Sequence, residues 1–267
     1  MEKYYSHKLS PFQRQVLVGT LLGDAHLRAN SKKTLYQYVV LQSGFHKEYV
    51  FHLYEIFKNC TPTPPKEYTF EDKRFPGKTY TRWSFYTSFQ SCFRFYAHQF
   101  YKDVESEKIS SSIRSNLSPK DFLEDKSLTD KSQICNQRSV WDVWLQIEDL
   151  SVYNGKQKNV SYKRCKKVPK LIHKYLTPIA IAYWYMDDGA PKWKKRSLGV
   201  RFCTDGFTLS EIDRLSKVLR EKYNYKTSLQ KKGSSYRIYI SSDSYPILKN
   251  CIYPFLIPSM TYKFPIE

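Results

Sequence analysis

The sequence predicts an α+β protein made of two copies of one αββαββα unit. An apolar stretch that ends in aspartate occurs twice, as LVGTLLGDA from Leu17 and as IAYWYMDDG from Ile181. The segments downstream of the two stretches also match, which a chance pair of acids would not produce. An alternating segment then follows in each half. Two matched copies predict a pseudo-twofold arrangement of two sheets, each with one covered face and one open face.

Each apolar stretch is predicted to form a helix that ends at its aspartate, Asp24 or Asp188. Gly19 and Gly23 are four residues apart, so they leave one face of the first helix open to the second. A carboxylate at a helix C-terminus adds to the partial negative charge there, which is unfavourable unless a cation binds. Because Mg²⁺ prefers oxygen ligands, the two aspartates are expected to form a magnesium site where the helices end.

The matching segments, residues 40–57 and 202–219, each predict a strand, a turn at Gly44 or Gly206, and an amphipathic helix. Their offset is 162 (206 − 44), close to the 164 between the aspartates (188 − 24). Apolar residues recur at spacings of three and four in both helices: Val50, Leu53 and Phe57, then Ile212, Leu215 and Leu219. The alternating segments TYTRWSFYT and SYRIYISSD predict later strands, whose like-facing residues are Thr81, Trp83, Phe85, Tyr236, Ile238 and Ile240.

The repeat divides the chain into a first copy at residues 1–101 and a second at 166–267. Residues 102–165 have no counterpart in the second copy and are rich in Ser, Asp and Lys. They are predicted to be an insertion or linker.

The composition indicates a polyanionic partner. The 267 residues contain 44 Lys and Arg against 25 Asp and Glu, a net charge of +19, which is typical of proteins that bind nucleic acid. The 23 Tyr, 16 Phe and 5 Trp fit surfaces that contact nucleic acid. No apolar stretch approaches the ~20 residues that span a membrane, so no membrane partner is expected.

The two motifs resemble those of the LAGLIDADG homing endonucleases, in the single-chain, two-repeat form encoded by group I introns. The resemblance extends to YLTPIAIAYWYMDDG and to YPFLIPSMTYKFP near the C-terminus. It implies a saddle of antiparallel strands that binds a long asymmetric DNA duplex as a monomer. It also implies hydrolysis of both strands with Mg²⁺, for which Mn²⁺ can substitute, and an origin in a mitochondrion or chloroplast.

The resemblance also assigns site residues. Asp24 and Asp188 match the metal-binding catalytic acids, and Gly23 and Asp187 are the neighbouring ligands, Asp187 through its carbonyl. A catalytic lysine is expected before a proline near the end of each repeat. Lys263 fills this place in TYKFP, and CKKVPK offers Lys166, with Lys167 as the open alternative. Tyr183 departs from the pattern because it stands where the first motif has Gly19.

DNA bases are expected to be read by polar residues on the open strand faces, since alternate side chains of a strand point the same way. The candidates are Arg28, Asn30, Gln37, Gln42, Lys192, Lys194, Arg201, Lys226, Gln230 and Arg237.

Two other interpretations compete. YMDD also occurs in reverse-transcriptase palms, where it lies in a strand hairpin, but here LTPIAIAYWY predicts a capped apolar helix. The stronger alternative is a LAGLIDADG-type RNA maturase or a non-cleaving DNA-binding regulator. The insertion leaves room for binding of intron RNA, whereas Asp24, Asp188 and Lys263 favour cleavage.

The charge generates a first prediction. Affinity for duplex DNA should fall about 10³-fold or more between about 50 and 200 mM salt, because each neutralised phosphate releases counterions. Fluorescence anisotropy across a salt series measures this slope, and an affinity that does not change with salt would contradict the electrostatic interpretation.

Overall fold

The structure is a computed structural model that describes residues 7–71, 77–105, 162–193 and 196–265. Each half contains the predicted αββαββα order. The first half consists of α1 (Pro11–Leu22), β1 (His26–Ala29), β2 (Tyr36–Ser43), α2 (Lys47–Phe57), β3 (Lys66–Glu71), β4 (Thr79–Tyr86) and α3 (Arg94–Phe100). The second half consists of α7 (Pro178–Asp188), β7 (Gly189–Pro191), β8 (Val200–Phe202), α8 (Leu209–Tyr223), β9 (Thr227–Lys232), β10 (Ser235–Ile240) and α9 (Tyr245–Ile252). Within the described residues, no helix has the length and apolar character to cross a bilayer.

The two motif helices begin in the same way. Ser10 caps α1 in a capping box with Gln13, and Thr177 caps α7 by accepting the backbone N–H of Ala180. A proline follows each cap, where its fixed φ suits the first turn and its missing N–H costs nothing. Both helix starts are therefore fixed by local sequence.

Each half forms one four-stranded antiparallel sheet, with the orders β1-β2-β4-β3 and β7-β8-β10-β9. On one face of the first sheet, Tyr38, Val40 and Phe85 are buried in the core. The amphipathic helices have the predicted buried faces, which consist of Val50, Leu53 and Phe57 in α2 and Ile212, Leu215 and Leu219 in α8. The covered face of each sheet is thus the core face, and the opposite face is open.

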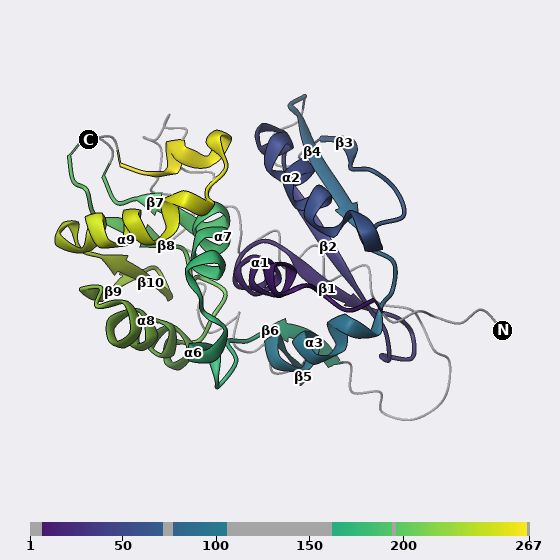
Figure 1. Cartoon of the computed structure of the whole chain (residues 1–267), viewed down its shortest axis with the longest axis horizontal. Helices are drawn as coiled ribbons and strands as arrows, with labels where there is room; N and C mark the ends of the chain where they lie inside the picture. The colour runs from purple at the N-terminus through teal and green to yellow at the C-terminus, as the bar shows by residue number, and fades with distance from the viewer. Residues whose placement is uncertain (1–6, 72–76, 106–161, 194–195, 266–267) are drawn as a thin grey trace.

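Helices α1 and α7 pack side by side at the centre of the molecule, with the rest of each half to the outside (Figure 1). A Cβ atom at Gly19 would lie 2.4 Å from the Ala180 carbonyl oxygen and 2.8 Å from Tyr183 Cβ. A Cβ atom at Gly23, one turn later, would lie 2.1 Å from Asp187 Oδ2. The contacts advance in the same direction along both helices, so their C-terminal ends meet.

Tyr183 is accommodated despite standing at the position that aligns with Gly19. Its ring stacks on His52 with 5.9 Å between ring centroids, and its hydroxyl contacts His52 Nε2 at 2.7 Å. The ring therefore packs beside the helix pair and does not separate it.

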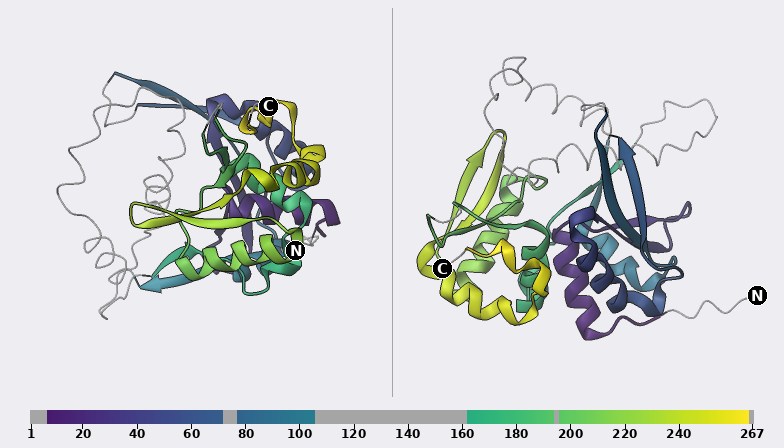
Figure 2. Two further views of the ribbon diagram at one scale, coloured as in Figure 1. Left: turned by 90° about the vertical axis from the view of Figure 1, so that its left-hand side faces the viewer. Right: turned by 90° about the horizontal axis from the view of Figure 1, so that it is seen from above.

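The ends of the predicted insertion are two strands. β5 (Tyr101–Glu105) and β6 (Tyr162–Lys166) pair in antiparallel register, and the short helix α6 (Ile172–Tyr175) leads on to α7. Figure 2 shows this strand pair in two further orientations. Residues 106–161 lie outside the described residues, so the boundaries 1–101, 102–165 and 166–267 stay a prediction.

The helix contact generates a second prediction. Gly→Ala inside a helix ordinarily stabilises it by up to about 1 kcal/mol. Gly19→Ala should instead lower the free energy of unfolding by about 1–3 kcal/mol, because the new methyl group meets the backbone of α7. Urea unfolding followed by circular dichroism measures the change, and a gain in stability would contradict the close packing.

Candidate active site

Three aspartates gather where α1 and α7 end. Asp24 follows α1, and Asp187 and Asp188 are the last two residues of α7. The backbone N–H of Asp24 donates to Asp187 Oδ2 at 3.0 Å, which joins the two helix ends directly. The Asp188 side chain is buried with 1% exposure, whereas Asp24 is half-buried. Helix packing thus brings the acidic ends of the two motifs together.

Gln42, at the end of β2, binds two of these carboxylates. Its Nε2 donates to Asp24 Oδ2 at 2.9 Å and to Asp187 Oδ1 at 3.1 Å. Its Oε1 faces His46 Nδ1 at 3.1 Å, and His46 Nε2 contacts the Tyr262 hydroxyl at 2.9 Å. Burial, and then the positive charge of Lys263, lowers the pKa of His46 to about 4, so its ring is neutral at pH 7.

A lysine from each half contacts an equivalent carbonyl beside an aspartate. Lys166 Nζ donates to the Gly23 carbonyl at 2.6 Å, and Lys263 Nζ donates to the Asp187 carbonyl at 2.7 Å. Gly23 and Asp187 are separated by the repeat offset of 164 (187 − 23). Two separate stretches of chain therefore place a positive charge symmetrically at the two helix ends.

Lys167, the alternative to Lys166, makes a backbone contact beside the β5–β6 strand pair. Its backbone N–H donates to the Phe100 carbonyl at 2.7 Å, which extends the pairing of β5 and β6. Lys166 is the residue whose ammonium group reaches the end of α1. The geometry therefore favours Lys166 as the site lysine.

The donor set suits a hard divalent cation. Carboxylates and backbone carbonyls are oxygen ligands, and Mg²⁺ takes its remaining ligands from water and phosphate. Within the described part of the chain, no group of three or more His, Cys, Asp or Glu side chains could hold a metal ion by itself. The described carboxylates and carbonyls at the helix ends are therefore oxygen donors of the kind that hard divalent cations take.

On the open face of the second sheet, three of the predicted DNA-reading residues lie together. Cα register places Arg201, Gln230 and Arg237 on one face, together with Lys232. Arg237 donates to Asp205 from Nε at 3.0 Å and from Nη2 at 2.5 Å. Burial, then the charge of Arg237, lowers the pKa of both Arg201 and Lys232, while Asp205 opposes the shift. The crowded positive charge makes this face favourable for an anion.

In the first sheet the predicted residues divide between both faces. Arg28 and Gln37 are register partners on the open face, where Arg28 Nη2 donates to Gln37 Oε1 at 2.6 Å. Asn30 holds a turn by accepting the N–H groups of Thr34 and Leu35. Gln42 was predicted to read DNA, but it lies on the covered face of the sheet. Its side chain contacts Asp24 and so belongs to the acid site.

Two of the remaining predicted residues, Lys192 and Lys226, lie at the edges of the second sheet. Lys192 Nζ lies over the Tyr239 ring, 4.1 Å from its centroid, on the open face. Lys226 pairs with Asp243 at 3.0 Å in an exposed position. Lys194 lies outside the described residues.

The open face of the first sheet also carries a set of aromatic and basic residues that was not predicted from the sequence. Register places six such residues there: Lys66, Tyr68, Phe70, Tyr80, Arg82 and Tyr86. The Arg82 guanidinium lies 3.7 Å from the centroid of the Phe70 ring, and Tyr80 stacks on Phe70. The alternation in TYTRWSFYT indicates this face in the sequence. The residues of the set that belong to β4, namely Tyr80, Arg82 and Tyr86, alternate with the predicted like-facing residues Thr81, Trp83 and Phe85.

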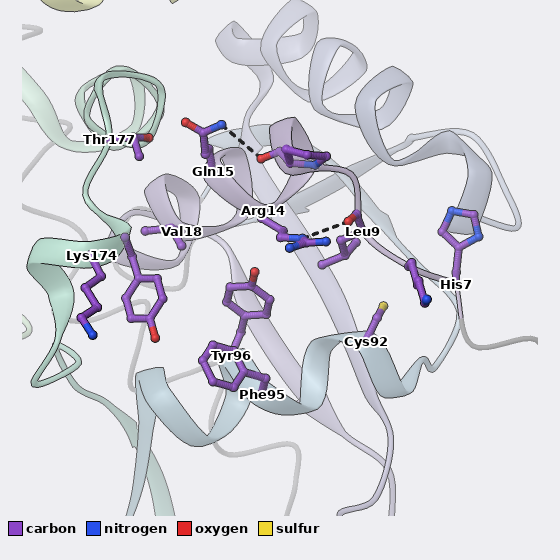
Figure 3. A pocket seen from close by; sticks show the side chains of 13 residues that line it. His7, Leu9, Arg14, Gln15, Val18, Cys92, Phe95, Tyr96, Lys174 and Thr177 are labelled. Carbon is purple, nitrogen blue, oxygen red and sulfur yellow. Dashed lines mark hydrogen bonds between the residues drawn. The ribbon is translucent and has the colours of Figure 1, made fainter.

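A separate hollow of about 580 Å³ lies near the N-terminal end of α1 (Figure 3). Arg14, Tyr96 and Lys174 line it, and Arg14 donates to the Leu9 carbonyl at 3.0 Å. Among the described residues that line it there is no aspartate or glutamate. It is therefore distinct from the acidic site at the other end of α1.

Residues 14–122 and 125–248 match the sequence profile of the LAGLIDADG DNA endonuclease family. The chain belongs to this family. The matched segments contain both motif helices, α1 from Arg14 onward and all of α7, and so include Asp24 and Asp188.

The relatives include proteins named as endonucleases and proteins named as mRNA maturases. DNA endonuclease I-ChuI of Chlamydomonas applanata is 29% identical over 263 residues, which cover 96% of this chain and 95% of the relative. Cytochrome b mRNA maturase bI2 of Debaryomyces hansenii is 40% identical over 113 residues, 42% of each chain. Among solved structures, homing endonuclease I-WcaI bound to its DNA recognition sequence has a TM-score of 0.68 at 19% identity, covering 98% of this chain and 89% of that chain. This likeness supports the fold.

The lysine geometry generates a third prediction. Lys166→Met should reduce the rate of DNA cleavage about 10²-fold, because it removes a positive charge placed at the acid site. Lys167→Met, a matched change one residue away, should leave the rate close to wild type. Single-turnover cleavage measures both rates, and a larger loss in Lys167→Met than in Lys166→Met would reverse the assignment.

Proposed function

We propose that this chain is a site-specific DNA endonuclease that binds a long asymmetric duplex as a monomer and hydrolyses both strands with Mg²⁺. The single observation that carries the proposal is the meeting of two acidic helix ends, each with a lysine on an equivalent carbonyl. Two such sets of groups suit the hydrolysis of two strands, one set for each strand, and one chain supplies both.

The residues have distinct tasks in this proposal. Asp24 and Asp188, with the carbonyls of Gly23 and Asp187, would hold the cation, for which Mn²⁺ could substitute. A bound Mg²⁺ supplies Lewis acidity at the scissile phosphate and lowers the pKa of water. Lys166 and Lys263 contribute positive charge where negative charge develops on the phosphate. The packed helix ends fix these groups before substrate binds, which reduces the reorganisation needed during reaction.

The two open sheet faces support recognition of an asymmetric target. The first face combines Arg28 with exposed aromatic side chains, including Tyr80, whereas the second carries Arg201, Gln230 and Lys232. Arginine recognises guanine through two hydrogen bonds, and apolar side chains contact the thymine methyl group. Because the two faces differ chemically, the two half-sites of the target should differ in sequence.

A second candidate function is RNA binding in intron splicing. It is favoured by one observation, the 40% identity over 113 residues to a protein named an mRNA maturase. Relatives named as intron-encoded endonucleases support an origin in an organelle intron. Incubation with intron RNA, in parallel with the intronless gene, tests whether the chain also acts on RNA.

The acid site generates a fourth prediction. Asp24→Asn and Asp188→Asn should each abolish or severely reduce double-strand cleavage, because both weaken cation binding. DNA affinity should stay within about threefold of wild type, since most contacts that hold the duplex go to phosphates and the strand faces.

Plasmid cleavage with Mg²⁺ and with excess chelator measures activity, and gel shift in Ca²⁺ measures binding. Equal loss of binding and cleavage in a folded variant, or cleavage that persists in chelator, would contradict the assignment of the acids.

A further inference from the structure

The polar contacts at the helix ends hold Asp24 in two ways. Its carboxylate accepts from Gln42 Nε2 at 2.9 Å, and the same nitrogen donates to Asp187 Oδ1 at 3.1 Å. The other oxygen of Asp187, Oδ2, accepts the backbone N–H of Asp24 at 3.0 Å. Asp187 therefore fixes the main chain of Asp24 directly and its side chain through Gln42.

The orientation of the Gln42 amide is determined by its neighbours. Both of its N–H hydrogens point at carboxylates, so its oxygen must face His46 Nδ1, 3.1 Å away. Because that oxygen can only accept, His46 donates from Nδ1, and its Nε2 accepts from the Tyr262 hydroxyl at 2.9 Å. Rotation of the amide would break three contacts at once, so the bridge between Asp24 and Asp187 is preorganised.

The corresponding positions in the other half are occupied differently. The repeat offsets align Asp187 with Gly23 (187 − 23 = 164) and Gln42 with Thr204 (204 − 42 = 162). Gly23 has no side chain, and the Thr204 hydroxyl donates to the Tyr236 carbonyl at 2.7 Å. A Cβ atom on Gly23 would lie 2.1 Å from Asp187 Oδ2. The Asp187 carboxylate thus fills the space that Gly23 leaves, and the aligned residues cannot build the same bridge toward Asp188.

We propose that Asp187 and Gln42 are a positioning pair for Asp24, and that this pair makes the two strand-cleaving centres unequal. The inference rests on the proposed endonuclease function. It assigns to the Asp187 side chain a task separate from that of its carbonyl. The carboxylate does not act on DNA; it orients the acid of the opposite repeat. Loss of the pair should therefore slow cleavage of one strand more than cleavage of the other.

Two conservative variants break the bridge at different places. Asp187→Asn keeps the shape but replaces one accepting oxygen with a donor, so it cannot accept from both Asp24 and Gln42. Gln42→Met keeps the side-chain length but removes the amide. Thr204→Val is the matched control, because it removes one polar group at the equivalent position of the second half.

The assay follows both strands of one target duplex, each with its own end label, under single-turnover conditions with Mg²⁺. In both bridge variants, cleavage of the same strand should slow about 10- to 100-fold relative to the other, the range seen when support of a ligand is lost. Nicked product should accumulate, while DNA affinity and melting temperature stay near wild type. Thr204→Val should keep the wild-type ratio of strand rates.

The double variant Asp187→Asn/Gln42→Met separates positioning from general damage. If the two residues act on Asp24 through one bridge, the double variant should be no more than about twofold slower than the slower single variant. The proposal would be overturned if the single variants slowed cleavage of both strands by the same factor. It would also be overturned if the losses in cleavage rate of the two single variants added up in the double variant. A wild-type protein that cleaves neither strand would instead overturn the proposed function, so the two failures are distinguishable.

Discussion

The close parallel contact between α1 and α7 is the constraint on which the rest of the structure depends. Gly19 and Gly23 allow the helix backbones to approach so closely that a methyl group at either position would collide with α7. Parallel packing brings two helix C-termini to one place, where their partial negative charges and three aspartates accumulate. Such an arrangement needs compensating positive charge, and Lys166 and Lys263 supply part of it.

The same contact makes the two halves chemically different. A strictly symmetric pair would place identical residues on both sides of the pseudo-twofold axis, but Asp187 faces Gly23 across it. Similar asymmetry occurs at the strand faces, where aromatic residues dominate the first sheet and Arg201, Lys232 and Arg237 gather on the second. A single chain can let its halves diverge in this way, whereas a homodimer cannot.

Much of the fold could be predicted from the sequence because the repeated signals are local. The caps at Ser10 and Thr177, and the spacing of Val50, Leu53 and Phe57, depend on neighbouring residues alone. The role of Gln42 could not be predicted, because alternation along a strand gives two faces without saying which one is covered. Its contact with Asp187 joins residues 145 positions apart, and no local pattern encodes that distance. The choice of Lys166 over Lys167 likewise needed the position of the Gly23 carbonyl.

We propose that the joined ends of α1 and α7 form the cation site of a DNA endonuclease. Anomalous diffraction from crystals of the protein with Mn²⁺ and a cognate duplex tests this claim most directly. We expect anomalous peaks in contact with the carboxylates of Asp24 and Asp188 and with DNA phosphate oxygens. Manganese bound only elsewhere, with the scissile phosphates far from both aspartates, would contradict it.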